Sequence, residues 1–394
     1  MQSNLPAPAS LSIQSSGISQ ATSHKLQALL AGPLARKDIH HAILGIEAAD
    51  RSWHWYAAGG QANPAGREMT VDTPFFIASV DKLFTAVATL LFHEKGMLNL
   101  DSPISSCLPT SITQGLHRYR GVDYSDRVTV RHLLSHSSGL ADYLEDRLKS
   151  GRSLIEELVE QGDRHLELEE VAEIIRGQLS PHFPPQDLNS ARVKIRYCDS
   201  NYFLLIAILE RVSGKSLPAL FRELFFEPFG LKNTFFDDPA QPHPRMAAVA
   251  SLWFTDQAVQ IPNMLRDLRS IYSTLADTIA FLRALVKGQV FDQPATLSAM
   301  QRWNRFGFPF DMAALRAPSW PIQYGLGMMR YQVPRLLSPA YSMPALVGHS
   351  GSTGTWLFYC QKLDLFLSGA VNQGTAGPIP FRLLPQVLRV LETQ

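Results

Sequence analysis

The stretch FFIASVDKLFTAVATLL, residues 75–91, is the most informative part of the sequence. The residues after Lys82 are apolar around nearly the whole helix circumference, which predicts a buried helix that ends at Gly96. Ser79 and Lys82 are three residues apart and therefore share one face of the first turn. Free N–H groups and the positive end of the helix dipole at that turn can stabilise an oxyanion. Because burial disfavours an ammonium ion, a lysine there can take the proton that a serine nucleophile must lose.

Ser and Lys at this spacing occur by chance in many proteins, so two further segments matter. In RYCDSNY, residues 196–202, Tyr197 is expected on the loop before a second buried helix that ends at Gly214. A phenol beside a lysine can relay a proton to or from a serine oxygen. In LVGHSGSTG, residues 346–354, His349 lies at the end of a strand-like run, and the small residues after it let a ligand approach the backbone. Taken singly, the tyrosine is more often a packed aromatic residue and the histidine is as often structural.

Together, these segments resemble the three motifs of the serine β-lactamase and penicillin-binding-protein superfamily. The motifs are SVDK at 79–82, YCD at 197–199 and HSG at 349–351. Further matching segments are TVRHLLSHSSGL at 129–140, EPFGLKNT at 227–234 and YGLG at 324–327. The resemblance extends from about residue 25 to the C-terminus, and within the superfamily it favours class C β-lactamases and family VIII esterases.

The resemblance implies an acyl-enzyme on Ser79, with Lys82 as its activating partner and Tyr197 as the proton shuttle. It implies an oxyanion hole formed by the backbone N–H groups of Ser79 and Ser352, and it implies neither metal nor organic cofactor. His349 is the fourth catalytic candidate, and it stands where class C β-lactamases usually carry a lysine. Without that permanent cation to bind the carboxylate of a β-lactam, we do not expect strong β-lactamase activity.

Several other residues are expected to contact the substrate. Asp199 stands where the family pattern has an amide, and an ionised carboxylate cannot donate a hydrogen bond. It could instead pair with Lys82 and hold that lysine more positive. The stretch 303–320 is crowded with aromatic residues and fits either the packing of a long loop or an apolar substrate wall or lid. The candidates for substrate contact are Asp199, Gly351, Trp303, Phe308 and Trp320.

The order of patterns along the chain predicts an α+β fold. Strand-like runs at 41–48 and 53–58 form a hairpin, and further short runs occupy 327–371 before a last helix at 381–391. We expect one antiparallel sheet built from both chain termini and flanked by helices, plus an all-helical domain. The expected division is a flexible tail at 1–22, a discontinuous α/β domain at 23–78 plus 324–394, and a mostly helical domain at 79–323. The active site would lie in the cleft between the two domains.

Composition excludes several classes of protein. Apolar residues make up 45% of the 394 residues, and 36 basic against 35 acidic residues leave a net charge of +1. This balance does not favour nucleic acid or an anionic membrane as partner. With no secretory signal pattern, no membrane-spanning run of about 18 apolar residues and only three cysteines, we expect a cytoplasmic protein.

Two alternative motifs fail. His132 and His136 are four residues apart, but Leu133 follows His132, so the HExxH zinc-protease pattern is absent and both histidines are expected to be structural. Residues 348–352 end in serine, so the nucleophile elbow of α/β-hydrolases is absent as well.

The leading hypothesis is a carboxylesterase with an apolar acyl pocket, acting on a small-molecule ester. It is favoured by His349 and by the aromatic stretch 303–320. A D-amino-acid amidase or peptidase, a weak β-lactamase and an acyltransferase could use the same site. A non-catalytic relative that binds a ligand or oligomerises is the hypothesis of another class. The sequence leaves the choice between monomer and homo-oligomer open.

Overall fold

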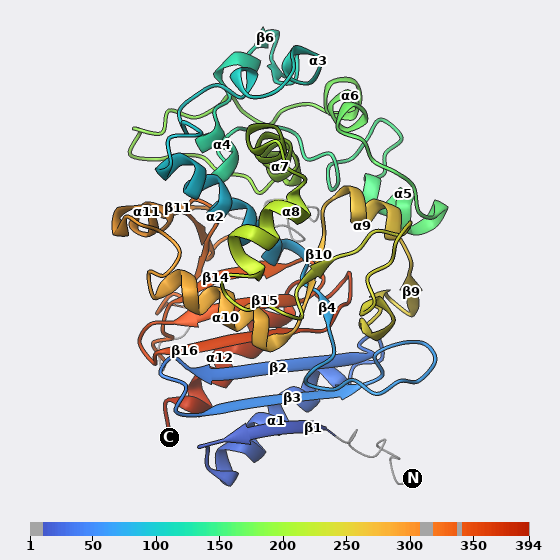
Figure 1. Ribbon diagram of the computed structural model, residues 1–394, viewed down its shortest axis with the longest axis vertical. Helices are drawn as coiled ribbons and strands as arrows, with labels where there is room; N and C mark the ends of the chain where they lie inside the picture. The colour runs from blue at the N-terminus through green and yellow to red at the C-terminus, as the bar shows by residue number, and fades with distance from the viewer. Residues whose placement is uncertain (1–10, 308–317, 337–340, 394) are drawn as a thin grey trace.

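A nine-stranded antiparallel sheet forms the base of the molecule, and a largely helical part lies against one of its sides (Figure 1). The computed structural model describes residues 11–307, 318–336 and 341–393. The order of the sheet is β1-β3-β2-β16-β15-β14-β13-β12-β11. Its strands are β1 (Ser12–Ser16), β2 (His41–Ala48), β3 (His54–Gly60), β11 (Asn304–Arg305), β12 (Gln323–Tyr324), β13 (Met329–Tyr331), β14 (Leu346–Gly351), β15 (Thr355–Cys360) and β16 (Leu365–Ala370). Because β16 pairs with β2, the two ends of the chain build one sheet, as expected.

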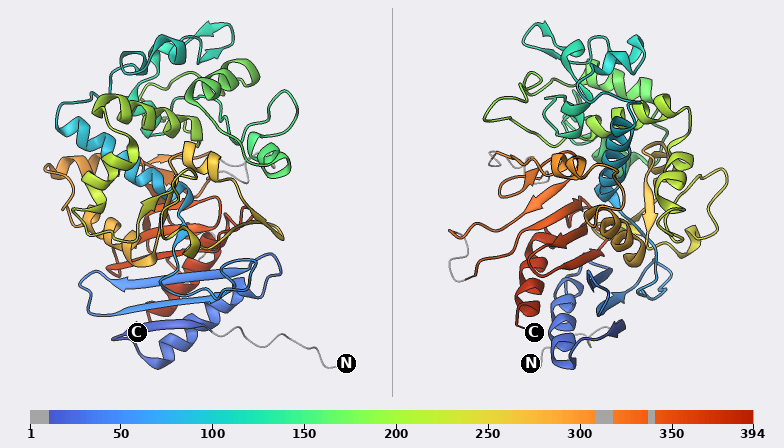
Figure 2. Two further views of the ribbon diagram at one scale, coloured as in Figure 1. Left: turned by 45° about the vertical axis from the view of Figure 1, so that its right-hand side comes forward. Right: turned by 60° about the vertical axis from the view of Figure 1, so that its left-hand side comes forward.

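Helices cover both faces of this sheet. On one face, α1 (Gln20–Leu34) and α12 (Ile379–Leu391) pack against each other (Figure 2). On the other face, α10 (Leu275–Val286) packs against β16, β15 and β2. Successive side chains of a strand point to opposite faces, so Leu44 belongs to the first layer and Ile43 to the second. The alternation explains why these central strands are apolar throughout.

The remaining elements form the helical part and its small sheets. Its helices are α2 (Asp81–Glu94), α3 (Thr110–Thr113), α4 (Val130–Leu134), α5 (Leu154–Gln161), α6 (Leu168–Gln178), α7 (Asp199–Ser213), α8 (Leu217–Phe221), α9 (Pro262–Asp267) and α11 (Pro294–Met300). Short 3-10 turns lie at η1 (Ala78–Val80), η2 (Ile104–Ser106), η3 (Ser125–Arg127) and η5 (Met246–Ala248), and a π-helical turn lies at η4 (Arg222–Phe226). The small sheets are β4 (Phe75–Phe76), β10 (Ile271–Ser273) and β7 (Phe235–Phe236); β5 (Arg118–Tyr119) and β6 (Val122–Asp123); and β8 (Leu252–Phe254) and β9 (Gln257–Val259).

The two buried helices predicted from the sequence lie at the centre of the helical part. Helices α2 and α7 pack against each other, and the Phe84 ring of α2 stacks on Phe281 of α10 with ring centroids 3.6 Å apart. Gly214 ends α7 in the left-handed conformation at φ 66°, a position that favours glycine. The helix that carries Lys82 is therefore held from both sides by apolar contacts.

The N-terminal segment differs from the expected flexible tail. Within residues 1–22, β1 pairs with β3 along its whole length, and α1 already begins at Gln20. Ser19 caps α1, and the Ser23 hydroxyl accepts a hydrogen bond of 2.9 Å from the indole N–H of Trp55. A polar edge strand such as SIQSS is held by its backbone, so its side chains show no apolar alternation that would have revealed it.

The expected boundary at residue 323 also differs from the packing. Helix α10 covers one face of the main sheet and β11 forms its edge, although both lie within residues 79–323. Ile279 and Leu282 of α10 are buried in the same core as sheet residue Phe366. The sheet layer therefore takes elements from the middle of the chain as well as from its ends.

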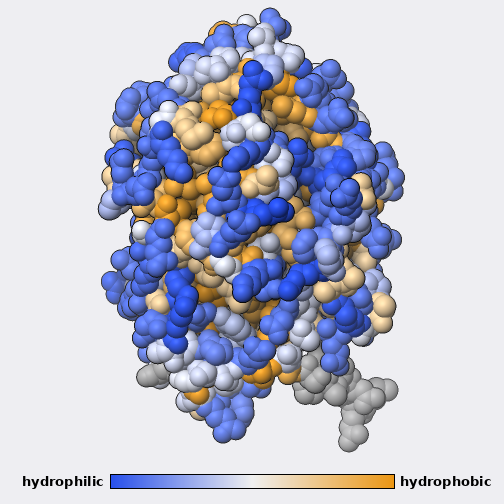
Figure 3. All heavy atoms as spheres, viewed as in Figure 1, coloured by the Kyte–Doolittle hydropathy of each residue, from blue (hydrophilic) through white to orange (hydrophobic). Residues whose placement is uncertain are grey.

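Polar side chains cover most of the face shown in Figure 3, and apolar side chains show mainly in the recesses between them. Among the described residues, the large apolar side chains that are exposed are Ile13, Met97, Val122 and Leu336. In the part of the chain that the structure describes, no helix is both long and apolar enough to span a bilayer.

Candidate active site

Ser79 lies in the middle of η1, the tight turn that leads into α2. Ala78 before it has φ 47°, a left-handed conformation that is strained for a residue with a side chain. The N–H of Ile77 donates a hydrogen bond of 3.1 Å to the carbonyl of Ile271, which anchors the turn to β10. Ser79 itself is half-buried. The turn thus holds the hydroxyl at the start of a buried helix while leaving it partly accessible.

Lys82 connects this serine to helix α7. Its Nζ donates to Ser79 Oγ at 3.1 Å and forms an ion pair with Asp199 Oδ1 at 2.7 Å. Burial alone would lower the pKa of Lys82, but the Asp199 carboxylate, with Tyr197 and Asp81, raises that pKa well above its usual value. Lys82 is therefore an ammonium ion in the resting site. Its ion pair with Asp199 matches the alternative role of Asp199 given in the sequence analysis.

Tyr197 lies over the same ammonium. Its ring centroid is 5.5 Å from Lys82 Nζ, and its side chain comes from the loop directly before α7, as expected. Burial raises the pKa of Tyr197, and the nearby Lys82 and Ser79 side chains oppose this only in part. Among the described residues, no partner reaches the buried Tyr197 hydroxyl with standard hydrogen-bond geometry. At rest the phenol keeps its proton beside the serine and the ammonium.

His349 lies on β14, fully buried behind Tyr197, with the two ring centroids 6.2 Å apart. Its Nδ1 is 2.8 Å from the carbonyl of Ser350, and its Nε2 is 3.1 Å from the hydroxyl of Tyr324. These partners assign the proton to Nδ1, so Nε2 accepts from Tyr324. Burial, together with the Lys82 ammonium, lowers the pKa of His349 to about 3. The ring is neutral, and it brings no positive charge to this position.

Gly351 brings the end of β14 against the turn of Ser79. A Cβ atom at Gly351 would lie 2.7 Å from the Ala78 Cβ and 3.2 Å from the Ser79 nitrogen, so a larger residue would push the two segments apart. Ser352 follows directly and is exposed. Among the described residues, no carbonyl or side chain accepts a hydrogen bond from the N–H of Ser79 or of Ser352. Both donors are thus available at the position where an oxyanion hole is predicted.

Of the three aromatic candidates for substrate contact, the structure describes Trp303 and Trp320. Trp303 is partly buried and packs against the helical core, and Trp320 is partly exposed. Phe308 lies outside the described residues. Phe306, between them, forms an isolated bridge with Ile195, two residues before Tyr197. This bridge ties the aromatic stretch to the loop of the tyrosine, and a role for these rings in substrate binding stays a prediction.

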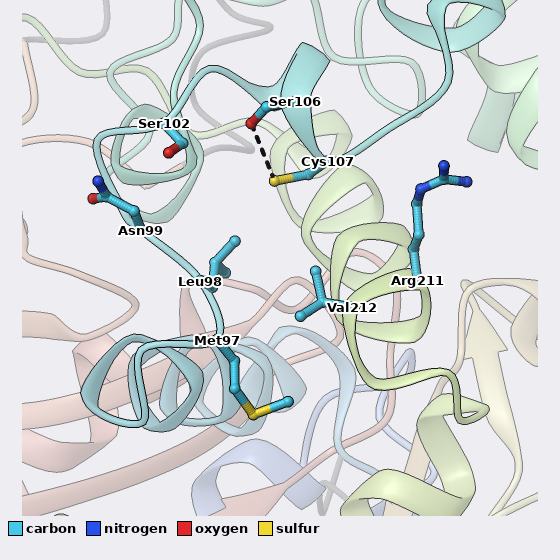
Figure 4. Close-up of a pocket in the computed structure, with 8 residues that line it drawn as sticks. All are labelled: Met97, Leu98, Asn99, Ser102, Ser106, Cys107, Arg211 and Val212. Atoms are coloured by element: carbon cyan, nitrogen blue, oxygen red, sulfur yellow. Dashed lines mark hydrogen bonds between the residues drawn. The ribbon is translucent and has the colours of Figure 1, made fainter.

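Two surface hollows lie elsewhere. One of about 350 Å³ is lined by Met97, Leu98, Asn99, Ser102, Ser106, Cys107, Arg211 and Val212 (Figure 4). Another of about 370 Å³ is lined by Thr110, Ser111, Gln114, Gly115, Arg118 and Arg176. Neither hollow is lined by Ser79, Lys82, Tyr197, Asp199 or His349. Across residues 11–307, 318–336 and 341–393, no group of three or more His, Cys, Asp or Glu side chains is arranged to hold a metal ion.

Comparison with known proteins identifies the family of the chain. The β-lactamase family model matches residues 29–391. The chain belongs to the β-lactamase family. It is 26% identical over 217 residues to a penicillin-binding protein of Bacillus subtilis (strain 168), and the match covers 53% of this chain and 40% of that relative. It is 32% identical over 183 residues to the esterase EstB of Burkholderia gladioli, covering 46% of this chain and 43% of that relative.

The chain therefore spans less than half the length of these two curated relatives. Its fold resembles that of the D-amino acid amidase from Ochrobactrum anthropi SV3, with a TM-score of 0.72 and 20% identity over 95% of this chain and 99% of that structure. This likeness shows a shared fold. The family expected from the three motifs and the α+β fold expected from the order of patterns along the chain are both confirmed.

The sequence did not predict two buried residues that form hydrogen bonds to Asp199 and His349. Asp142 is buried, and its carboxylate accepts hydrogen bonds from the N–H groups of Asp199 at 2.8 Å and Leu144 at 2.9 Å. Tyr324, noted only as part of a family marker, links His349 to Tyr202, whose hydroxyl is 3.2 Å away. The signal available for Asp142 was its place two residues after the 129–140 signature. No local pattern marks the tyrosine contact.

Proposed function

We propose that the protein is a serine hydrolase that forms an acyl-enzyme on Ser79, and that it acts as a carboxylesterase. The observation that carries the proposal is the position of Lys82 Nζ, within 3.1 Å of Ser79 Oγ and 2.7 Å of Asp199, beneath the ring of Tyr197. A nucleophile, a cation and a phenol from two separate segments converge on one point. The matches to an esterase and to a penicillin-binding protein support the same chemistry.

In the proposed acylation step, the reactive form has Tyr197 ionised and Lys82 positively charged. The phenolate takes the proton of Ser79 as Oγ attacks the carbonyl carbon of the ester. The N–H groups of Ser79 and Ser352 stabilise the oxyanion that results. Tyr197 then gives its proton to the leaving alkoxide as the ester C–O bond breaks. The acyl group is now on Ser79, and the phenolate is regenerated.

Deacylation repeats these transfers with water. Tyr197 takes a proton from water as the water oxygen attacks the acyl carbonyl, and it returns the proton to Ser79 Oγ when the acid leaves. The Lys82 ammonium stabilises the phenolate in both steps. Because the resting phenol holds its proton tightly, the proposed mechanism predicts activity that rises toward alkaline pH.

The charges around the site support an uncharged ester as substrate. His349 is neutral and Lys82 is already paired with Asp199, so neither offers a free positive charge to a substrate carboxylate. The aromatic residues at 303–320 support an apolar acyl group. A second candidate is hydrolysis of aminoacyl amides, which Asp199 favours because its side chain, 19% exposed, could bind a substrate ammonium.

The charge balance supports a small-molecule partner rather than nucleic acid. Three unpaired cysteines support a reducing, cytoplasmic location.

The test is covalent labelling followed by substrate comparison. Incubation with a fluorophosphonate should place one adduct on Ser79, found by peptide mass spectrometry, and Ser79→Ala should remain unlabelled. Turnover of p-nitrophenyl esters of increasing acyl length should exceed that of a D-alanyl p-nitroanilide and of a chromogenic cephalosporin. An intact protein with neither adduct nor turnover would leave only a non-catalytic binding function. A higher kcat/KM for the anilide or the cephalosporin would replace the esterase proposal with that activity, and acyl transfer to an added alcohol would reveal an acyltransferase.

A further inference from the structure

His136 is a fully buried histidine that the proposed mechanism does not use. It lies just after α4, and its backbone has φ 55°, a left-handed conformation that residues with a β-carbon rarely adopt. Strained backbone of this kind persists only where the surroundings hold it in place, and it concentrates at functional sites. His132, one turn earlier, shows none of this strain; it caps α4 with Thr129.

His136 contacts both neighbours of Tyr197. Its carbonyl accepts the N–H of Arg196 at 2.9 Å, and its ring Nδ1 accepts the N–H of Cys198 at 3.2 Å. The imidazole also lies against the phenol ring, with centroids 4.4 Å apart and planes 37° from parallel. One residue therefore holds the backbone before Tyr197, the backbone after it and the face of its ring.

The hydrogen bonds determine which ring nitrogen of His136 carries the proton. Nδ1 also accepts from the Asn201 amide at 3.0 Å, and the Asn201 carbonyl oxygen is fixed by the Ser138 hydroxyl at 2.7 Å. Since both of its neighbours donate, Nδ1 is unprotonated and the proton is on Nε2. Burial, with the Lys82 ammonium and His349, lowers the pKa of His136 well below its usual value. A neutral ring preserves the acceptor that Cys198 needs.

We propose that His136 is the positioning residue for Tyr197, holding the phenol over Ser79 and Lys82 through its carbonyl, its Nδ1 and its ring face. This inference rests on the proposed role of Tyr197 as proton shuttle. Proton transfer depends steeply on the position of the shuttle, so a small displacement of the loop at 196–198 should reduce kcat and leave ester binding largely intact.

Two variants separate the contacts. His136→Phe keeps a ring against Tyr197 and removes the acceptor for Cys198. His136→Asn keeps an acceptor near the Nδ1 position, tolerates the left-handed backbone and removes the ring. We expect His136→Phe to lower kcat for a p-nitrophenyl ester by about 10- to 100-fold with KM nearly unchanged. His136→Asn should retain more activity than His136→Phe, and the reverse order would overturn the role given to Nδ1.

A double-mutant cycle with Tyr197→Phe tests whether His136 acts through the tyrosine. In the Tyr197→Phe background, His136→Phe should lower kcat by less than about twofold, because the group that it positions is gone. An equal effect in both backgrounds would mean that His136 contributes only to general stability and would overturn the proposal. His132→Asn is the matched control, since His132 bonds to Thr129 and Gln186, away from the tyrosine; its kcat should be unchanged.

A readout without turnover distinguishes failure of this inference from failure of the proposed function. With 3-fluorotyrosine incorporated, the ¹⁹F NMR signal of Tyr197 can be assigned by its loss in Tyr197→Phe. His136→Phe should shift and broaden that signal, while His132→Asn leaves it in place. If Tyr197→Phe keeps full activity, the proposed shuttle is wrong, and the NMR result alone then decides whether His136 positions the ring. An unchanged Tyr197 signal in a folded His136→Phe protein would overturn the inference.

Discussion

Asp199→Asn is the substitution that tests the electrostatics of the site most directly. The Asp199 carboxylate lies 2.7 Å from Lys82 Nζ, and both side chains are largely buried. At that separation, two unit charges attract by about 1.5 kcal/mol in a water-like dielectric and about 6 kcal/mol at an effective dielectric constant of 20. One pKa unit corresponds to about 1.4 kcal/mol, so the carboxylate supports a shift of roughly 1 to 4 units, and a single opposite charge commonly produces about 1 to 3.

The amide oxygen introduced by Asp199→Asn would accept the same hydrogen bond without the charge. The pKa values of Lys82 and Tyr197, which Asp199 raises, should therefore both fall. The reactive phenolate then forms at lower pH, and the alkaline limb of the kcat/KM profile should move down by about 1 to 3 pH units. Part of the gain at neutral pH is offset, because a weaker base accepts the serine proton less readily. Burial raises the pKa of Asp81 to about 7, and the Asp199 carboxylate adds to this, so the pKa of Asp81 should also fall in Asp199→Asn.

The assay is the pH dependence of kcat/KM for a p-nitrophenyl ester, corrected for spontaneous hydrolysis at each pH. Asp199→Glu keeps the charge and should leave the limb near its original position. Asp101→Asn removes the acid of the exposed ion pair with Arg131 and should change nothing. If the limb of Asp199→Asn stays at the same pH or moves to higher pH, Lys82 and Tyr197 are not the coupled titrating pair.

The other predictions concern single contacts of the site. Lys82→Ala and Tyr197→Phe should each lower kcat by at least about 10², measured by ester turnover, and a near-normal rate would remove that residue from the mechanism. Gly351→Ala introduces a Cβ that clashes with the turn that carries Ser79, so urea unfolding should show a free energy of unfolding lower by about 1–3 kcal/mol. Fluorophosphonate labelling of Ser79 should also slow. Full activity would show that the turn can move. Tyr324→Phe leaves the Nε2 acceptor of His349 buried without its donor, which should lower the free energy of unfolding by about 1–3 kcal/mol. Because the His349 ring is neutral, this loss should be the same at every pH between about 5 and 8. A loss that depends strongly on pH in this range would contradict the assigned tautomer.

Local patterns predicted the parts of the site that depend on a single segment. The Ser79 and Lys82 spacing is set by one helical turn, and the loop position of Tyr197 follows from the start of α7. One sheet built from both chain ends was expected because short apolar runs occur at both ends, although which strands would pair was not. Each of these features follows from residues that are close in sequence or from a strong apolar period.

The remaining features depend on contacts between distant segments. His136 was expected to be structural, since nothing in its own neighbourhood shows that the loop of Tyr197 folds back onto it. His349 was placed among the catalytic residues, yet both of its ring nitrogens already have buried partners, so a direct part in proton transfer stays a prediction. Strand β1 was missed because an edge strand held by its backbone needs no apolar side chains.

The pairing of β2 with β16 also has a consequence during synthesis on the ribosome. The hairpin of β2 and β3 is translated about 300 residues before its apolar neighbour at Leu365–Ala370. Until then, the β2 edge of the hairpin lacks its partner strand, and such exposed edges invite aggregation. Contacts so distant in sequence also slow folding. The nascent chain should therefore depend on chaperones until β16 has emerged, and the proposed hydrolytic activity should not appear before then.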